Sequence, residues 1–212
     1  MKLILLHGLG QTPQDWSEVV RRLDGVETEC PPLFPAAGEV TYARIFAALA
    51  QRLSEIEEPV CLCGLSLGAM LALDYAAQFP ENVAHLVLCG AQYKVPRVLF
   101  GLQNLLFRLM PASAFAEMGL SKQNVLALTR SMRALDLTAQ LGGIACPTDV
   151  LCGENDRANR KAARELAARL PRAERIVLPQ AGHELNRDAP EPLAALLARR
   201  IGLLREVPSE KD

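Results

Sequence analysis

Residues 60–79, VCLCGLSLGAMLALDYAAQF, decide the fold of this 212-residue chain. An apolar run of strand length passes at once into apolar residues at helical spacing, which predicts a buried strand followed directly by a helix. Gly64-Leu65-Ser66-Leu67-Gly68 lies at the corner, where two glycines relieve the crowding of close backbones and Ser66 takes a strained conformation. The Ser66 hydroxyl would project at the carboxyl edge of a sheet, beside a helix N-terminus whose N–H groups can stabilise an anion. Taken alone, the string also fits an ordinary glycine-rich turn.

Short apolar runs alternate with longer segments of helical period along most of the chain, which predicts an α/β fold with a parallel sheet covered by helices on both faces. One run, Val26–Cys30, alternates apolar and acidic residues, which is typical of an edge strand. The predicted strands are Lys2–Leu6, Val26–Cys30, Pro59–Cys63, Val83–Cys89, Thr148–Cys152 and Arg175–Leu178. The predicted helices are one that opens at Thr12 and Pro13, then Tyr42–Ile56, Leu67–Phe79, Arg157–Leu170 and Pro192–Leu204.

Residues 92–135 interrupt this alternation with helical character and no strand, and the segment is too long for a simple connection. We therefore predict a helical cap over 92–135, inserted in a core of residues 1–91 and 136–212. This segment has one acidic residue, Glu117, and six basic ones: Lys94, Arg97, Arg108, Lys122, Arg130 and Arg133. Its net charge is therefore +5, and that of the remainder of the chain is −6. The basic side chains either solvate an amphipathic helix or favour acyl substrates that bear a carboxylate or phosphate.

Composition excludes several classes of protein. Half of the residues are hydrophobic, and 23 Lys and Arg balance 24 Asp and Glu, so we expect one compact domain that does not bind nucleic acid. The apolar run Leu3–Leu6 is too short for a signal peptide or a spanning helix, so we expect a cytoplasmic protein without a membrane partner. Four of the six cysteines, Cys61, Cys63, Cys89 and Cys152, fall in strand-like runs and are predicted to be reduced and buried rather than metal ligands.

A serine hydroxyl is a poor nucleophile until a base takes its proton, so the Ser66 hypothesis requires a histidine at the same sheet edge. The chain has three, His7, His85 and His183. Loops that follow parallel strands open on one edge, and His183 lies in such a loop after the last strand. His85 falls near the amino end of its strand, so we expect it at the surface and away from the site.

The loop after the strand Thr148–Cys152 offers two carboxylates that could orient the histidine, Glu154 and Asp156. Asp156 also precedes a predicted helix, so it could instead be an N-cap that contributes about 1 kcal/mol of helix stability. Asp149 lies inside the strand near its other end, and the sequence suggests no function for it.

These residues together resemble the α/β-hydrolase superfamily. The order Ser66, Asp156, His183, with His7-Gly8 after an early strand, matches its pattern, and the resemblance extends from His7 nearly to the C-terminus. It implies that Ser66 is the nucleophile, His183 the general base and Asp156 the acid that holds the imidazole.

The resemblance also implies an oxyanion hole formed by the backbone N–H groups of Leu9 and Leu67, with His7 in a structural role. Members commonly carry two strands before the one that ends in His-Gly, and Met1 leaves no room for them here. We therefore expect a three-layer, doubly wound sheet of six strands, with Val26–Cys30 at an edge. Because the missing strands would cover that edge, either a monomer or a homodimer paired along it is expected.

The sequence therefore predicts a carboxylesterase-like serine hydrolase that cleaves a small ester or thioester without cofactor or metal. Because a scaffold does not fix a reaction, a lyase of the menaquinone-pathway type, a perhydrolase and a non-hydrolytic small-molecule binder remain alternatives. Gly8-Leu9-Gly10 could suggest dinucleotide binding, but Pro13 occupies the third glycine position of that fingerprint. Residues from Gly64 onward lack the Lys-Ser/Thr pair of a P-loop.

Overall fold

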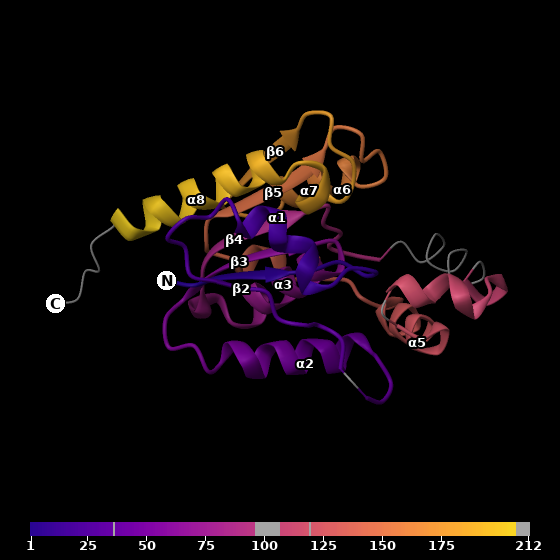
Figure 1. Cartoon of the computed structure of the whole chain (residues 1–212). Helices are drawn as coiled ribbons and strands as arrows, with labels where there is room; N and C mark the ends of the chain where they lie inside the picture. The colour runs from indigo at the N-terminus through magenta and orange to yellow at the C-terminus, as the bar shows by residue number, and fades with distance from the viewer. Residues whose placement is uncertain (36, 96–106, 119, 207–212) are drawn as a thin grey trace.

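The computed structural model describes residues 1–35, 37–95, 107–118 and 120–206. Its centre is one sheet of six parallel strands in the order β2-β1-β3-β4-β5-β6, which confirms the predicted fold class (Figure 1). The strands are β1 Leu3–Leu6, β2 Thr28–Glu29, β3 Val60–Leu65, β4 Val83–Cys89, β5 Thr148–Gly153 and β6 Ala173–Leu178. As predicted, β2 lies at an edge, where Glu29 pairs with Lys2 and Arg52.

Helices cover both faces of the sheet, because alternate residues of the buried strands point to opposite sides. On β1, Leu3 and Leu5 join one core cluster, while Ile4 and Leu6 join the other. The first cluster lies under η1 (Pro13–Trp16), α1 (Ser17–Val20), α7 (Leu185–Asp188) and α8 (Pro190–Glu206). The second lies under α2 (Tyr42–Leu53), α3 (Leu67–Gln78) and α6 (Arg160–Ala167), on the side where Figure 1 shows α2 and α3.

The chain leaves the core after β4 and returns before β5 through a short antiparallel pair that we call the neck, residues 93–95 and 135–137. Lys94 forms a bridge with Asp136, the Val95 N–H donates to the Leu135 carbonyl at 3.0 Å, and the Leu137 N–H donates to Tyr93 at 2.8 Å. Beyond the neck, the described residues form η3 (Ala112–Met118) and α5 (Lys122–Met132), which Figure 1 shows beside the core. Arg97 of the predicted cap lies outside the described residues.

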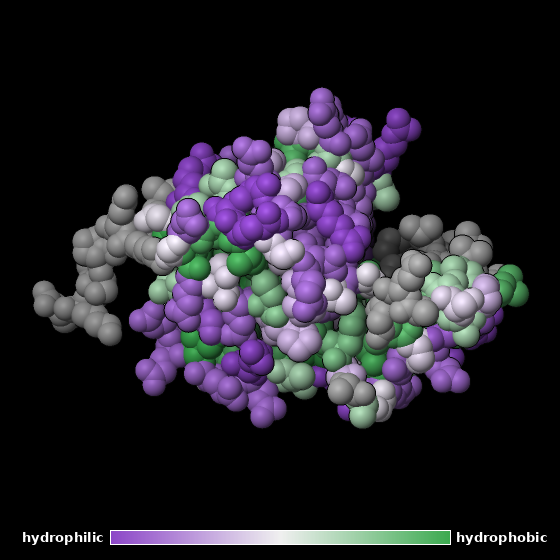
Figure 2. All heavy atoms as spheres, viewed as in Figure 1, coloured by the Kyte–Doolittle hydropathy of each residue, from purple (hydrophilic) through white to green (hydrophobic). Residues whose placement is uncertain are grey.

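Shorter elements complete the described chain: the 3-10 turns η2 (Pro80–Asn82) and η4 (Leu141–Gly143) precede β4 and β5. No described helix combines the length and apolar character needed to cross a bilayer. On the face shown in Figure 2, hydrophilic residues predominate over the core, with smaller hydrophobic areas between them.

All six cysteines have free thiols, and the four predicted to be buried are buried. Cys61, Cys63 and Cys89 lie in the core under α1 and α8, whereas Cys152 lies in the core on the other face of the sheet. Burial raises the pKa of the Cys61 thiol to about 12 and that of Cys152 to about 11, so both are neutral packing groups at physiological pH.

The prediction that His85 lies at the surface is wrong. His85 is 5% exposed, and its Nε2 lies 2.8 Å from Oδ2 of Asp149 on the neighbouring strand. Arg200 of α8 donates to both Asp149 oxygens, at 2.8 and 2.6 Å, and also to Glu174. Burial raises the pKa of the Asp149 carboxyl, but hydrogen bonds from His85 and Arg200 outweigh it and hold that pKa below the usual range. A paired histidine can therefore be buried where an isolated one would face water.

Replacement of Asp149 should reduce stability without touching the opposite sheet edge. Asp149→Asn removes the buried anion that pairs with half-buried Arg200 and buried His85, and it should cost about 3 kcal/mol of unfolding free energy, measured by urea denaturation at pH 7. The Asp149 carboxylate stabilises the folded protein at pH values above its ordinary pKa of 3.8. The difference in unfolding free energy between Asp149→Asn and wild type should therefore shrink as the pH falls below that value. Glu174→Gln, at the exposed partner of Arg200, is the control and should cost less than about 1 kcal/mol. Equal losses in the two variants would contradict the buried role of Asp149.

Candidate active site

The corner between β3 and α3 has the predicted strained geometry. Ser66 has φ 52° and ψ −107°, its N–H donates to the Cys89 carbonyl of β4 at 2.9 Å, and its hydroxyl makes no capping bond to α3. A Cβ atom on Gly64 would lie 2.3 Å from the backbone of Gly68, and one on Gly68 would lie 2.2 Å from the Leu6 carbonyl oxygen. Only glycine fits at these two positions, and the close backbone approach that they allow places Ser66 at the carboxyl edge of the sheet. The Ser66 hydroxyl is not used to cap α3.

Asp156 and His183 meet at the same edge, from the loops that follow β5 and β6. Oδ2 of Asp156 lies 2.7 Å from Nδ1 of His183, and the carboxylate is buried while the imidazole side chain is 40% exposed. Of the two candidate carboxylates, the structure brings Asp156 to the histidine. Glu154 instead accepts the Gln180 N–H at 2.9 Å and so fixes the loop after β6.

The hydrogen bonds of this pair set its ionisation. Burial raises the pKa of the Asp156 carboxyl, but hydrogen bonds from His183 and Asn159 outweigh it and hold that pKa below the usual range. The same bond to Asp156 raises the pKa of His183 against the opposing effect of burial. The arrangement thus favours an aspartate anion that stabilises an imidazolium.

The alternative role of Asp156 as a helix N-cap is wrong, because α6 begins at Arg160 and not at Arg157. The N-cap residue is Asn159, whose side chain binds the Asp156 carboxylate. The chain makes a turn between the two, in which the Asp156 carbonyl accepts the Asn159 and Arg160 N–H groups.

One peptide link at the end of β4 adjoins both Ser66 and His183. The Cys89 carbonyl accepts the Ser66 N–H, and the next residue, Gly90, packs on the imidazole. A Cβ atom on Gly90 would lie 2.8 Å from Cε1 and 2.9 Å from Nδ1 of His183, and Gly90 also has φ 58°. The sequence analysis missed Gly90, although a glycine directly after a predicted strand is a recognisable sign of close backbone approach.

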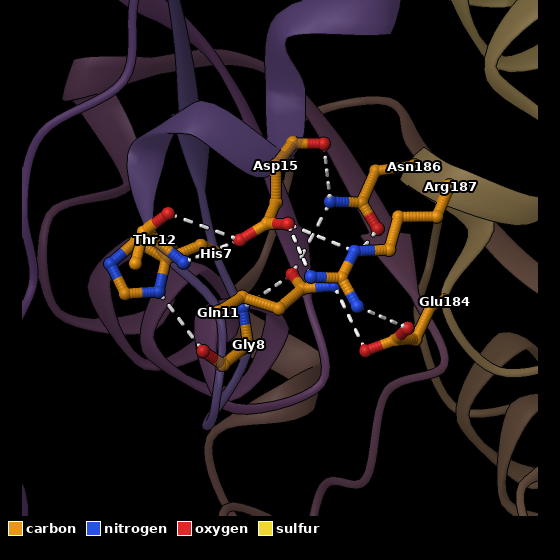
Figure 3. Close-up of polar contacts among 8 residues, drawn as sticks. All are labelled: His7, Gly8, Gln11, Thr12, Asp15, Glu184, Asn186 and Arg187. Atoms are coloured by element: carbon orange, nitrogen blue, oxygen red, sulfur yellow. Dashed lines mark hydrogen bonds and ion pairs between the residues drawn. The ribbon is translucent and has the colours of Figure 1, made fainter. Parts of the chain in front are cut away.

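His7 is 1% exposed and has the structural role that the resemblance implied. Its Nδ1 donates to the Gly8 carbonyl at 2.9 Å (Figure 3). Its Nε2 accepts the Leu33 N–H at 3.3 Å. The two partners require a neutral ring with its proton on Nδ1, and burial correspondingly lowers the pKa of His7. His7 thereby holds the end of β1 against the segment that follows β2.

The loop that contains Leu9 is tied to the loop after His183 by a buried glutamine. The Gly8 N–H donates to Oε1 of Gln11 at 3.1 Å, and Nε2 of Gln11 donates to Glu184 and Asn186, each at 3.2 Å (Figure 3). Gln11 and Asn186 are 1% and 0% exposed. The sequence analysis missed both, because a single amide in a loop carries no sign of the partner that it meets across the fold.

The chain matches the model of the alpha/beta hydrolase family over residues 3–196, and it belongs to that family. It is 39% identical over 94 residues to the pimeloyl-[acyl-carrier protein] methyl ester esterase of Aromatoleum aromaticum, a match that covers 42% of this chain and 36% of that protein. The aligned part is thus little more than a third of that relative. Over 199 residues the chain is 26% identical to RutD of Enterobacter cloacae subsp. cloacae, which is named as a proposed carbamate hydrolase. This match covers 78% of this chain and 75% of that protein.

Solved structures of low sequence identity share the fold. The enol-lactonase from Burkholderia xenovorans LB400 has a TM-score of 0.83 at 17% identity, with 97% of this chain and 91% of that chain covered. A hydrolase from Pseudomonas aeruginosa PA01 has a TM-score of 0.80 at 20% identity, with 95% and 89% covered. With the curated relatives, these matches support a hydrolase of the alpha/beta fold.

A side chain at Gly90 should separate His183 from Asp156. Gly90→Ala places a methyl group against the imidazole and requires a positive φ from alanine, so we expect loss of the deshielded imidazole N–H proton signal in NMR spectra and lower thermal stability. Gly142→Ala is the matched control, because a Cβ atom there meets nothing within 4 Å. A wild-type N–H signal in Gly90→Ala would show that the contact does not position the ring.

Proposed function

We propose that the protein is a serine hydrolase that cleaves a carboxylic ester or thioester of a small acyl substrate through an acyl-enzyme at Ser66. The observation that carries this proposal is the Asp156–His183 hydrogen bond of 2.7 Å at the sheet edge where strained Ser66 presents a free hydroxyl. The names of the relatives, one an esterase and one a proposed carbamate hydrolase, support hydrolysis at a carbonyl.

In the proposed reaction, the Ser66 oxygen attacks the substrate carbonyl carbon while His183 accepts the hydroxyl proton at Nε2. Asp156 holds the Nδ1–H side of the ring and stabilises the imidazolium. The tetrahedral intermediate collapses to an acyl-enzyme, and the imidazolium gives its proton to the leaving alcohol or thiol. Water then attacks the acyl carbon by the same steps and releases the acid and Ser66.

The oxyanion would be held by the backbone N–H groups of Leu9 and Leu67. Leu67 is the first residue of α3, where backbone N–H groups lack partners within the helix. Leu9 lies in a turn closed by the Gln11 N–H donating to the Gly8 carbonyl at 3.2 Å, and Gly10 completes it with φ 82°. Gln11 anchors this turn to the loop after His183, so the donor and the base would keep a fixed separation.

Loss of Ser66 should abolish hydrolysis. We expect Ser66→Ala to lower kcat on p-nitrophenyl esters by about three orders of magnitude or more with unchanged thermal stability, measured beside a panel of thioesters of graded chain length. A fluorophosphonate probe should add one mass increment to wild type, on Ser66, and none to the variant. Full esterase activity in Ser66→Ala would refute the assignment, and an unlabelled wild-type protein without turnover would favour a non-hydrolytic binder.

We further propose that the basic cap segment favours anionic acyl substrates. Arg108, Arg130 and Arg133 surround a hollow of about 40 Å³ beside Leu126, and none of the three forms an ion pair with another described residue. Lys122 donates to the carbonyls of Arg108 and Met110, at 2.7 and 2.6 Å, and so holds this segment against α5. The three guanidinium groups are thus free to attract a carboxylate or phosphate.

Removal of these charges should affect anionic substrates selectively. The double variant Arg130→Gln/Arg133→Gln should lower kcat/KM for an ester with a terminal carboxylate by about 5-fold to 10-fold at low salt, because Debye screening weakens the attraction as salt rises. A neutral ester of equal chain length should react at the wild-type rate in this variant. Arg199→Gln, an exposed charge on α8, is the control. Equal wild-type rates for the two esters at every salt concentration would dispose of charge selection.

A further inference from the structure

Asn159 occupies the N-cap position of α6 but does not cap the helix. An asparagine at this position normally accepts an N–H of the first turn, which contributes about 1 kcal/mol. Asn159 makes no such bond, although it is 9% exposed and its side chain is fully partnered elsewhere. A good capping residue is therefore used here for something other than the helix.

The Asn159 amide lies between the cap neck and the Asp156–His183 pair. Its Nδ2 is 2.9 Å from both carboxylate oxygens of Asp156 and 3.1 Å from Nδ1 of His183. Its Oδ1 accepts a hydrogen bond from Nε2 of Gln92 at 2.6 Å. Asn159 is thus the only side chain besides His183 for which the described residues show a hydrogen bond to the Asp156 carboxylate.

The direction of these hydrogen bonds is fixed by chemistry. An ionised carboxylate only accepts, so the NH₂ group of Asn159 must face Asp156 and the amide oxygen must face Gln92. Gln92 must then present its own NH₂ group. A reversed Asn159 would set its oxygen against two carboxylate oxygens, so the orientations of residues 92, 159 and 156 are set together.

Gln92 lies where the chain passes from β4 into the neck. The adjoining Tyr93 carbonyl accepts the Leu137 N–H across the neck, and the Tyr93 hydroxyl donates to Glu165 of α6 at 2.9 Å. The start of the neck is therefore held to α6 at two consecutive residues. One of these attachments leads directly to the Asp156 carboxylate.

We propose that Asn159 is a positioning residue for Asp156 and that Gln92, which donates to the Asn159 oxygen, holds that amide in place, so that the residue before the neck supports the acid of the triad. This inference rests on the proposed function, in which Asp156 orients the imidazole of His183. Two donated hydrogen bonds keep the carboxylate plane fixed while Oδ2 remains directed at Nδ1. Asn159 itself touches no reacting atom.

Asn159→Asp tests the inference, because aspartate is an equally good N-cap and its charge suits a helix N-terminus. An Asn159 that served only the helix N-terminus therefore predicts a wild-type rate and pH profile. The inference predicts kcat about 100-fold lower at pH 8 with unchanged KM, because an acceptor then faces Asp156. The second carboxylate beside buried Asp156 should also lower the melting temperature at that pH. At lower pH the introduced carboxyl is protonated and can again donate a hydrogen bond to Asp156. In the variant, kcat should therefore fall as the pH rises through the pKa of that carboxyl, a decrease that wild type lacks.

A second pair of variants tests Gln92, which is half-buried and does not touch Asp156 or His183. Gln92→Glu presents an acceptor to Oδ1 of Asn159, so the two oxygens repel and the amide should shift from its place against Asp156, with a loss of about 10-fold in kcat. Gln92→Leu leaves Asp156 to orient Asn159 and should lose less than about 3-fold. In an Asn159→Leu background, Gln92→Glu should change kcat by less than about 2-fold, since the intermediate amide is gone.

The outcomes separate this inference from the proposed function. Wild-type kcat and pH profile in both Asn159→Asp and Gln92→Glu would overturn the positioning role, while loss of activity in Ser66→Ala would leave the serine mechanism standing. Should Asn159→Asp fail to fold, Gln92→Glu decides: a loss no larger than that of Gln92→Leu refutes the orientation effect. Full activity of Ser66→Ala would instead remove the proposed function itself.

Discussion

The structure depends on a backbone contact between α3 and β1 that leaves no space for a side chain. A Cβ atom on Gly68 would lie 2.2 Å from the Leu6 carbonyl oxygen, so the first turn of α3 rests directly on the end of β1. This contact brings the Ser66 corner beside the His7-Gly8 loop, which leaves β1 at the same point. The chain reverses its direction across the sheet here, between β1 and β3, which is where open α/β sheets form their sites. The Ser66 hydroxyl, the N-terminus of α3 and the loop after β1 therefore meet at one edge of the sheet.

Buried neutral amides join the loops around this edge, beside the more exposed ion pairs of Arg187 with Asp15 and Glu184. Gln11 links the loop after β1 to the loop after β6, and Asn159 links the loop after β5 to Gln92 at the end of β4. An amide donates and accepts at once, so it can connect a carboxylate or backbone N–H to a further polar group while carrying no charge into a buried site. Buried ions would incur a desolvation cost and would alter the pKa of Asp156 and His183 directly. The amides fix geometry without adding a charge, although the hydrogen bond from Asn159 lowers the pKa of Asp156.

The sequence predicted those features that follow from periodicity and strand polarity. The six strands, the strained Ser66 and the choice of loops for Asp156 and His183 all depend on local pattern plus the rule that parallel strands end at one edge. Spacing alone left Glu154 and Asp156 open, because two residues in one loop differ only in the direction that the turn gives them; the family resemblance selected Asp156, the one that contacts His183. It placed the start of α6 three residues early, because Asn159 and Asp156 are equally good capping residues. Gln11 and Gln92 were missed because their side-chain partners are distant in sequence, and Asn159 was missed because it links nearby Asp156 to distant Gln92.

Two His–Asp pairs in the same sheet show why position, and not pairing alone, determines which histidine can be a base. His85 uses Nε2 to bind Asp149, at the amino end of β4, and Arg200 neutralises that carboxylate from α8. His183 uses Nδ1 to bind Asp156, beyond the carboxyl end of β6, and its side chain is 40% exposed against 6% for His85. Among the described residues no hydrogen bond engages Nε2 of His183. The two ends of the parallel strands have different neighbours. At the amino end, α8 supplies the Arg200 cation to Asp149. At the carboxyl end lie the loops and the N-terminus of α3. The same pair of side chains is therefore a structural ion pair at one edge and a candidate acid–base unit at the other.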